Sequence, residues 1–308
     1  MPEDEGQHIQ KVYPAAGMLG GQRSYAFNPE SHMTESSEYV SDVNRRAIFD
    51  AWAQYWNTSA PVLLEKSPPN LMKMRMLQEL FTPERSRFVV SIRHPLACAH
   101  FYYTDLRYKP GFQADCAANF VEHWLTLYRT ALEDLQIPDL AANVVVVQHE
   151  DVFGSTMEVA QGYIAELEMF LSLERQITLL PAGGSRSRSP LPSHHSRAAR
   201  TLKTIAKAHQ QQHQHQHQHQ QQRWRRRVLG YRGEDRQHVE VNLNTTFDWI
   251  KDFRAIFDLN SDACQSLIGK FEEEVNSFGY SLRDPSFFAD PPALHPFLLK
   301  TKALGFAS

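Results

Sequence analysis

The sequence predicts an α/β fold in which a parallel sheet is flanked by helices. Apolar, β-branched runs such as RFVVSI at 87–92 and NVVVVQ at 143–148 each end in a polar loop, and a segment of helical period follows each loop. Parallel strands joined by right-handed helical crossovers satisfy this alternation most simply. We therefore expect polar loops to gather at the carboxyl edge of the sheet, where open α/β sheets bind ligands.

The first predicted elements are a helix and a short strand. Residues 42–57 carry apolar side chains at three-to-four spacing, and Ser41 or Asp42 can cap the first turn of this helix. The apolar run 62–64 is predicted to be a strand. It ends in a Glu-Lys-Ser-Pro-Pro-Asn loop, because two successive prolines forbid a continuing strand or helix.

Helices and strands alternate from this loop to residue 173. In chain order we predict a helix over 70–81 that Asn70 can cap, a strand over 87–92, helices over 96–107 and 116–136, a strand over 143–148 and a helix over 156–173. The strands at 87–92 and 143–148 end at Arg-His-Pro and His-Glu-Asp, respectively. Trp124 lies on the apolar face of its predicted helix, and we assign it to the core.

A low-complexity insert interrupts the predicted domain. Residues 181–222 are rich in Pro, Gly, Ser and Arg and then in alternating Gln and His, so they cannot bury a core, and we predict that they are disordered. The predicted divisions are 1–180 for the main part of the domain, 181–222 for the insert, 223–285 for a C-terminal helical part of the same domain and 286–308 for a tail. Helices are expected over 245–259 and 262–278, with Gly279 at the end of the second.

Composition argues against several classes of protein. The net charge is −3, and the ten Lys and Arg residues of 181–227 are opposed by no acid, so the rest of the chain is acidic and no nucleic-acid partner is expected. No apolar run approaches the ~20 residues that span a bilayer, so we expect no membrane segment in this chain. The three cysteines are too few for a disulfide framework. The alternating histidines define no tetrahedral site, and no metal is expected.

Three strand-end loops, EKSPPN at 65–70, RHP at 93–95 and HED at 149–151, carry the polar chemistry. Their ordered succession, together with the helices and strands between them, resembles the Golgi-type sulfotransferases, including the tyrosylprotein and heparan classes. The resemblance covers roughly residues 3–175 and resumes more weakly over about 225–280. It implies a three-layer, P-loop-like fold, 3′-phosphoadenosine 5′-phosphosulfate as co-substrate and a location in the Golgi lumen.

The resemblance also implies roles for individual residues. Lys66 would steady the sulfuryl and bridging oxygens, and Glu5 would be the general base, with His8 as the second choice for the base. Arg93 would hold the 3′-phosphate of the donor, a task that suits a planar guanidinium. The alternatives are an exposed loop lysine at Lys66 and a solvated acidic segment around Glu5.

Other positions either extend this nucleotide site or depart from the family pattern. The family places a phosphate-binding serine where this chain has Phe101, and Tyr102 is our candidate for the missing contact. Arg227 and Tyr231, in RRRVLGY, resemble a basic and aromatic segment that closes over the nucleotide, with a solvated basic run as the alternative. The resemblance makes the acidic pair at 150–151 architectural.

The implied function is transfer of a sulfuryl group to a hydroxyl of a protein tyrosine or a glycan. The alternative is a catalytically inactive sulfotransferase-like binding protein; a nucleotide kinase is disfavoured because the sequence lacks Gly-x-x-x-x-Gly-Lys-Ser/Thr. The family's 5′-phosphosulfate loop has no counterpart before Glu3, and no predicted strand feeds the glycines at 17–21. We therefore expect an N-terminally truncated chain that is inactive until upstream sequence restores the loop.

Overall fold

The computed structural model describes residues 5–21, 24–104, 117–153, 157–173, 178–181, 238–241, 249–250, 254 and 258–299. Its α-helices are α1 (Gly6–Ile9), α2 (Asp42–Ala53), α3 (Met74–Phe81), α4 (Pro95–Thr104), α5 (Ala118–Asp134), α6 (Pro138–Ala141), α7 (His149–Phe153), α8 (Met157–Phe170) and α11 (Asp262–Ser277). The 3₁₀ helices are η1 (Ala16–Met18), η2 (Tyr25–Phe27), η3 (Pro29–Ser31), η4 (Pro68–Met72) and η6 (Pro292–Phe297). The strands are β1 (Phe88–Ile92), β2 (Val144–Gln148), β3 (Thr178–Pro181) and β4 (His238–Val241).

A parallel pair of strands lies at the centre of the molecule. β1 and β2 run in register from Phe88 opposite Val144 to Ile92 opposite Gln148. A single bridge from Leu298 extends the pair beside β2. The prediction of parallel strands at these two positions, within an α/β fold, is confirmed. Because parallel strands end at the same edge, the loops after β1 and β2 leave the sheet together.

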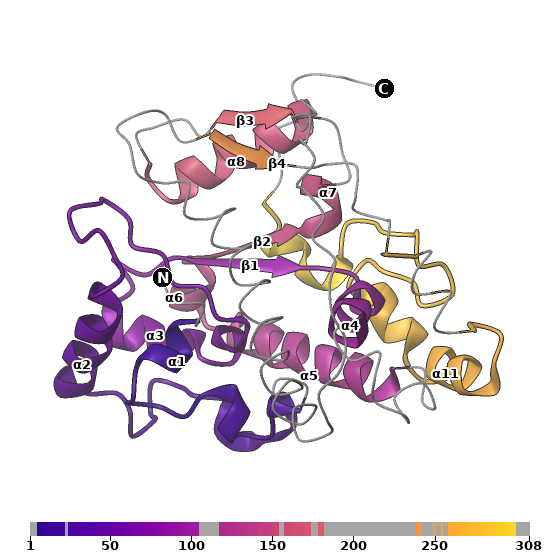
Figure 1. Cartoon of the computed structure of the whole chain (residues 1–308), viewed down its shortest axis with the longest axis horizontal. Helices are drawn as coiled ribbons and strands as arrows, with labels where there is room; N and C mark the ends of the chain where they lie inside the picture. The colour runs from indigo at the N-terminus through magenta and orange to yellow at the C-terminus, as the bar shows by residue number, and fades with distance from the viewer. Residues whose placement is uncertain are drawn as a thin grey trace, which may run out of the picture.

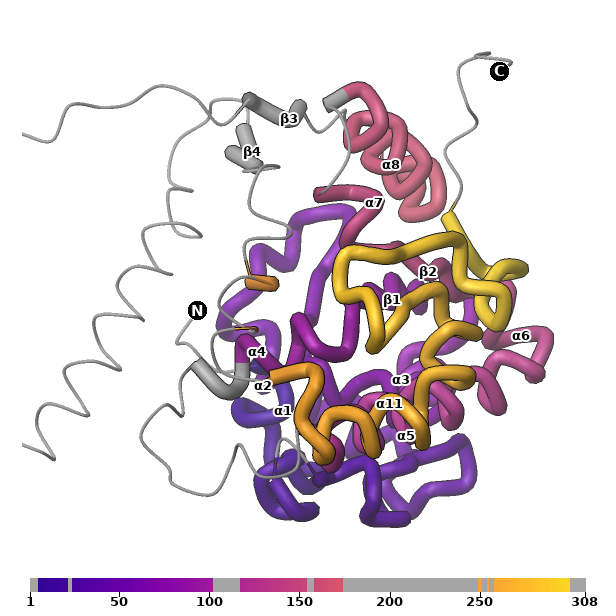
Figure 2. The backbone as a smooth tube through the Cα atoms, turned by 90° about the vertical axis from the view of Figure 1, so that its right-hand side faces the viewer, coloured from indigo at the N-terminus to yellow at the C-terminus, as the bar shows by residue number. Residues whose placement is uncertain are grey.

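Helices lie on both sides of this strand pair. In both views α5 lies on one side of β1 and β2, and α8 lies on the other (Figure 1, Figure 2). The largest buried cluster joins the strands to α5 and α11; it includes Ile92, Val146, Trp124, Leu125, Phe271 and Val275. A second buried cluster, drawn from residues between Tyr13 and Leu80, joins α2 and α3. It includes Ile48, Trp52, Met76, Leu77 and Leu80. Trp124 is therefore a core residue, as predicted.

The strand predicted at 62–64 is absent. These residues form no strand pairing, and Leu64 is 72% exposed. Leu64 O accepts a hydrogen bond of 2.9 Å from the indole N–H of Trp56. A strand needs a hydrogen-bonded neighbour, and within the described part of the chain none lies beside this run, so its apolar character alone does not make it a strand.

Helix boundaries differ most from prediction at the end of α2 and at the start of α3. Ser41 caps α2 by accepting a bond of 3.2 Å from the Asn44 N–H, but the helix ends at Ala53, before the predicted limit of 57. Asn70 caps no helix, because it lies inside η4, and α3 begins only after Lys73. The Asn70 side chain is used elsewhere, as a donor to Glu65.

The short helix α7 and the pairing of β3 with β4 were not predicted. α7 follows β2 without a break, and β3 pairs in parallel with β4 across the insert. Part of the segment assigned to a tail packs against the core: Leu294 is buried, and the Leu299 N–H donates to Val146 O at 2.9 Å. Apart from Pro181, the insert at 181–222 lies outside the described residues.

Candidate functional site

Glu5 and Lys66, the predicted base and the predicted sulfuryl-binding cation, lie together. Lys66 Nζ is 3.3 Å from Glu5 Oε1, although the two residues are 61 positions apart in the sequence. The Lys66 side chain is 71% exposed and that of Glu5 is 22% exposed, so the ammonium is open to an approaching ligand. His8, the second choice for the base, is exposed on α1. The pairing selects Glu5 over His8 as the partner of Lys66.

Two buried glutamines shape the segment that carries Glu5. Gln7 is 1% exposed, and its Nε2 donates to Glu5 Oε2 at 2.5 Å while its backbone N–H donates to Ser67 Oγ at 3.3 Å. Gln10 folds the chain back after α1: its Oε1 accepts from the N–H groups of Val12 and Tyr13. These bonds hold the Glu5 segment against the loop that carries Lys66.

Glu65 lies at the centre of this contact. Its Oε1 accepts the Gly6 N–H at 2.8 Å and the Ser67 hydroxyl, and its Oε2 accepts the side-chain amide of Asn70. Burial raises the pKa of the Glu65 carboxyl, and the bonds from Ser67, Asn70 and Gly6 oppose this by favouring the ionised form. Glu65 thus joins the Gly6 backbone to two side chains of its own loop.

A buried lysine lies beneath this loop. Lys73 is fully buried, its Nζ donates to Pro69 O at 3.4 Å, and it lies 5.6 Å from the centre of the Tyr13 ring. Burial lowers the pKa of Lys73 to about 8, and the negative charge of Glu65 partly opposes that change. A buried cation near a buried carboxylate offsets part of the cost of removing each from water.

Arg93 directly follows β1, at the carboxyl edge of the strand pair. Its backbone O accepts the indole N–H of Trp124 at 3.2 Å, and its Nε is buried without a hydrogen-bond partner among the residues that the structure describes. Burial, and after it the charge of Arg93, lowers the pKa of His149 to about 4. The guanidinium therefore lies near the start of α7, where β2 ends, and retains an unused donor.

Glu150 connects the two strand ends to the C-terminal part of the chain. Its Oε1 accepts the His94 N–H at 3.0 Å and its Oε2 accepts the Tyr280 hydroxyl at 2.7 Å. His94 Nδ1 accepts the Leu96 N–H, so Nε2 carries the proton that it shares with Ser281 O at 3.0 Å. The expectation that Glu150 is architectural is confirmed by these contacts.

The remaining predicted residues are less informative. Phe101, in the position of the family's serine, is 62% exposed on α4. Tyr102 is part of the same helix, but its side chain lies outside the described part of the chain, as do Arg227 and Tyr231. Sequence reasoning missed the contacts of Gln7, Glu65 and Tyr280, because no local pattern pairs a buried polar residue with a partner more than 50 positions away.

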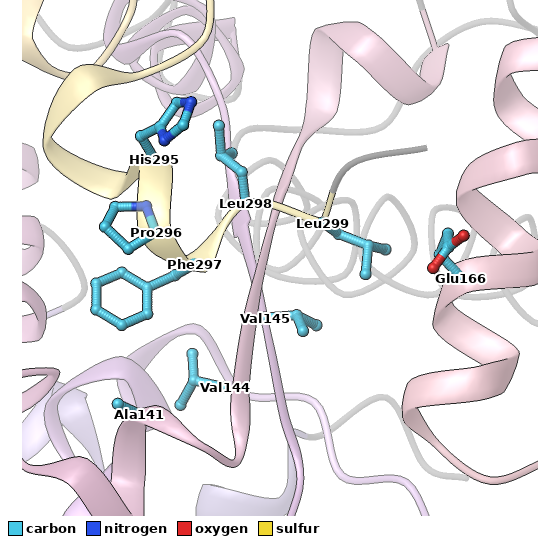
Figure 3. A pocket seen from close by; sticks show the side chains of 9 residues that line it. All are labelled: Ala141, Val144, Val145, Glu166, His295, Pro296, Phe297, Leu298 and Leu299. Carbon is cyan, nitrogen blue, oxygen red and sulfur yellow. The ribbon is translucent and has the colours of Figure 1, made fainter. Parts of the chain in front are cut away.

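An open pocket lies elsewhere in the fold. It has a volume of about 590 Å³ and is lined by Ala141, Val144, Val145, Glu166 and residues 295–299. Figure 3 shows these side chains around the first residues of β2, with Glu166 contributed by α8. Arg93 and Glu150 lie at the opposite, carboxyl end of the strands, so this pocket is separate from them.

Comparison with known proteins finds no matching family model, curated protein or solved structure. Within the described ranges, no group of three or more His, Cys, Asp or Glu side chains could hold a metal ion. No helix in those ranges is both long enough and apolar enough to cross a membrane.

Proposed function

We propose that this chain is a sulfotransferase that moves a sulfuryl group from 3′-phosphoadenosine 5′-phosphosulfate to a hydroxyl of a protein tyrosine or a glycan. The observation that carries the proposal is the contact of 3.3 Å between Glu5 and Lys66. Two residues that were assigned complementary roles from separate motifs are neighbours in space. If Glu5 were only a solvated acid and Lys66 only an exposed loop lysine, their two segments would not need the hydrogen bonds that hold them together.

The reaction needs a base and a cation at one place. The acceptor oxygen attacks sulfur while the bond from sulfur to the 5′-phosphate oxygen breaks, and the electron pair of that bond leaves with 3′-phosphoadenosine 5′-phosphate. The acceptor's proton passes to the Glu5 carboxylate. Lys66 balances the negative charge that develops on the bridging and sulfuryl oxygens. In the proposal, the ion pair opens when the donor anion competes with Glu5 for Lys66.

Arg93 supplies the second contact with the nucleotide. Open α/β sheets bind ligands at the carboxyl ends of their strands, and Arg93 stands at that end of β1. Its buried, unpaired Nε is a donor that a phosphate oxygen could satisfy. We propose a P-loop-like nucleotide site at this edge, to which Tyr102, Arg227 and Tyr231 are expected to contribute.

The cellular setting in the proposal is the Golgi lumen. Cys264 is disulfide-bonded, and disulfides persist in oxidising compartments such as the secretory pathway. Cys98, in contrast, carries a free thiol. The acceptor in that compartment would be a hydroxyl-bearing protein or glycan.

Transfer of labelled sulfate from the donor to tyrosine peptides and to glycans tests the proposal. The assay is run on the 308-residue chain and on the same chain extended by any coding sequence that lies upstream. Lys66→Met and Glu5→Gln should each reduce kcat by about two orders of magnitude or more, since each removes a group that acts in the transition state. Lys270→Met is the matched control, because Lys270 makes a comparable exposed ion pair with Glu122 at 3.5 Å.

Phe101 gives a specific reason to retain an inactive relative as the second candidate. A phenylalanine cannot donate the hydrogen bond that the family's serine gives to the 3′-phosphate. If both assayed chains bind the nucleotide but neither transfers sulfate, the result would favour the inactive binding protein. Transfer that persists in both Lys66→Met and Glu5→Gln would remove these residues from the mechanism.

A further inference from the structure

Glu65 receives hydrogen bonds from both sides of the candidate site. The Gly6 N–H, which donates to it at 2.8 Å, belongs to the residue directly after Glu5. The Ser67 hydroxyl, a second donor, belongs to the residue directly after Lys66. One carboxylate therefore holds the chain next to the base and the chain next to the cation.

The approach of Gly6 to Glu65 is unusually close. A Cβ added at Gly6 would lie 2.5 Å from both Cγ and Oε1 of Glu65, so no larger residue fits without displacing the carboxylate. The Gly6 O in turn accepts the buried indole N–H of Trp52 at 3.0 Å. Gly6 is thus fixed on both faces of its backbone, which leaves Glu5 little freedom to move away from Lys66.

We propose that Glu65 is the positioning residue of this site, and that its carboxylate sets the separation of Glu5 and Lys66. Its importance for transfer rests on the proposed function, but its control of the separation does not. Glu65 itself has no part in the chemistry, because its hydrogen bonds within the described part of the chain go to protein groups that hold the two segments. The competing explanation is that Glu65 merely stabilises the fold.

A polarity swap separates the two explanations. Asn70 Nδ2 donates to Glu65 Oε2, while the Asn70 Oδ1 is buried without a partner in the described part of the chain. Asn70→Asp places two carboxylates in contact and should break the arrangement. The double variant Glu65→Gln, Asn70→Asp restores it: the new amide oxygen accepts from Gly6 and Ser67, and the new amide nitrogen donates to the carboxylate at position 70.

Zero-length carbodiimide coupling, read by mass spectrometry, measures the separation directly. It joins a lysine amine to a carboxylate only when the two are in contact, so the wild type should give a Glu5–Lys66 cross-link. The ion pair between Lys270 and Glu122, at 3.5 Å, provides an internal control in the same sample. Neither the Glu5–Lys66 yield nor the Lys270–Glu122 yield depends on nucleotide binding or on sulfuryl transfer.

Glu65→Ala and Asn70→Asp should each lower the Glu5–Lys66 yield about fivefold or more, because each breaks at least one bond of the carboxylate cluster. The Lys270–Glu122 yield should stay constant, and the swapped double variant should recover the first cross-link. A role in stability alone predicts that both yields change together, which would overturn the proposal, as would an unchanged Glu5–Lys66 yield in Asn70→Asp. If Glu65→Ala fails to fold, the comparison of Asn70→Asp with the double variant decides. Loss of nucleotide binding with an intact cross-link would count against the proposed function alone.

Discussion

At Gly6 the identity of a single residue decides how two distant segments meet. The backbone passes so close to the Glu65 side chain that a methyl group would overlap it. The sequence shows that Lys66 and Arg93 each follow an apolar run and lie in a polar loop with prolines, whereas their roles in a site rest on the resemblance and stay predictions. Glu65, Gln7 and Gly6 could not be assigned roles, because their contacts join positions about 60 residues apart and no local signal records such pairs.

Gly6→Ala should destabilise the protein by about 1–3 kcal/mol, because the added methyl must displace a carboxylate that three donors hold. The free energy of unfolding in urea measures this effect. Gly17→Ala is the matched control, since nothing lies within 4 Å of a Cβ at Gly17, and it should be neutral or slightly stabilising. Equal effects of the two substitutions would show that the close contact at Gly6 is unimportant.

At the scale of elements, long periodic helices and strongly apolar strands were predicted well, whereas very short elements and the pairing of β3 with β4 were not. Residues 87–92 and 143–148 are strands within one residue of prediction, and the helix at 262–278 was placed correctly because Ser261 caps it and Gly279, at φ 81°, ends it. The prediction of a strand at 62–64 failed because an apolar run becomes a strand only when a neighbouring strand pairs with it. The five-residue α7 is too short to show a helical period.

The ends of β1 and β2 are joined to the C-terminal part of the chain by Tyr280, whose hydroxyl donates to Glu150. Tyr280→Phe should cost about 1–3 kcal/mol of stability, because it leaves a buried carboxylate without one of its donors. Chemical denaturation measures the loss. Tyr55→Phe, at a 39% exposed tyrosine, is the control and should change little. A Tyr280→Phe protein as stable as the wild type would show that water or another group satisfies Glu150 equally well.

At the scale of the whole molecule, the insert separates two strands that pair. β3 ends at Pro181 and β4 begins at His238, and the two run in parallel, so their connection must cross from one end of the pair to the other. Such a crossover takes about a dozen residues. Composition predicts an insert at 181–222 as a break in periodicity, and this stays a prediction because all of it but Pro181 lies outside the described residues. Composition gave no sign that strands flank this stretch, because the pairing of β3 with β4 spans more than 50 residues.

Deletion of residues 184–222 should leave cooperative thermal unfolding intact, with a midpoint within about 2 °C of the wild type, because residues 182–183 and 223–237 remain to span the crossover. Differential scanning calorimetry provides the measurement. A loss of the cooperative transition would mean that the polar, repetitive segment contributes to the core, contrary to its composition.

Isothermal titration with 3′-phosphoadenosine 5′-phosphate tests the proposed nucleotide site most directly. Arg93→Ala should weaken binding by about 1.5–3 kcal/mol, or roughly 10- to 150-fold in Kd, because it removes a charge-assisted contact, and Arg93→Lys should recover only part of the loss. Arg87→Ala, at an exposed arginine just before β1, serves as the matched control and should bind as the wild type does. The Kd of adenosine 5′-phosphate, which lacks the 3′-phosphate, should not change in Arg93→Ala. No binding by the wild type, or equal binding by the wild type and both Arg93 variants, would contradict the assignment of a 3′-phosphate site at the end of β1.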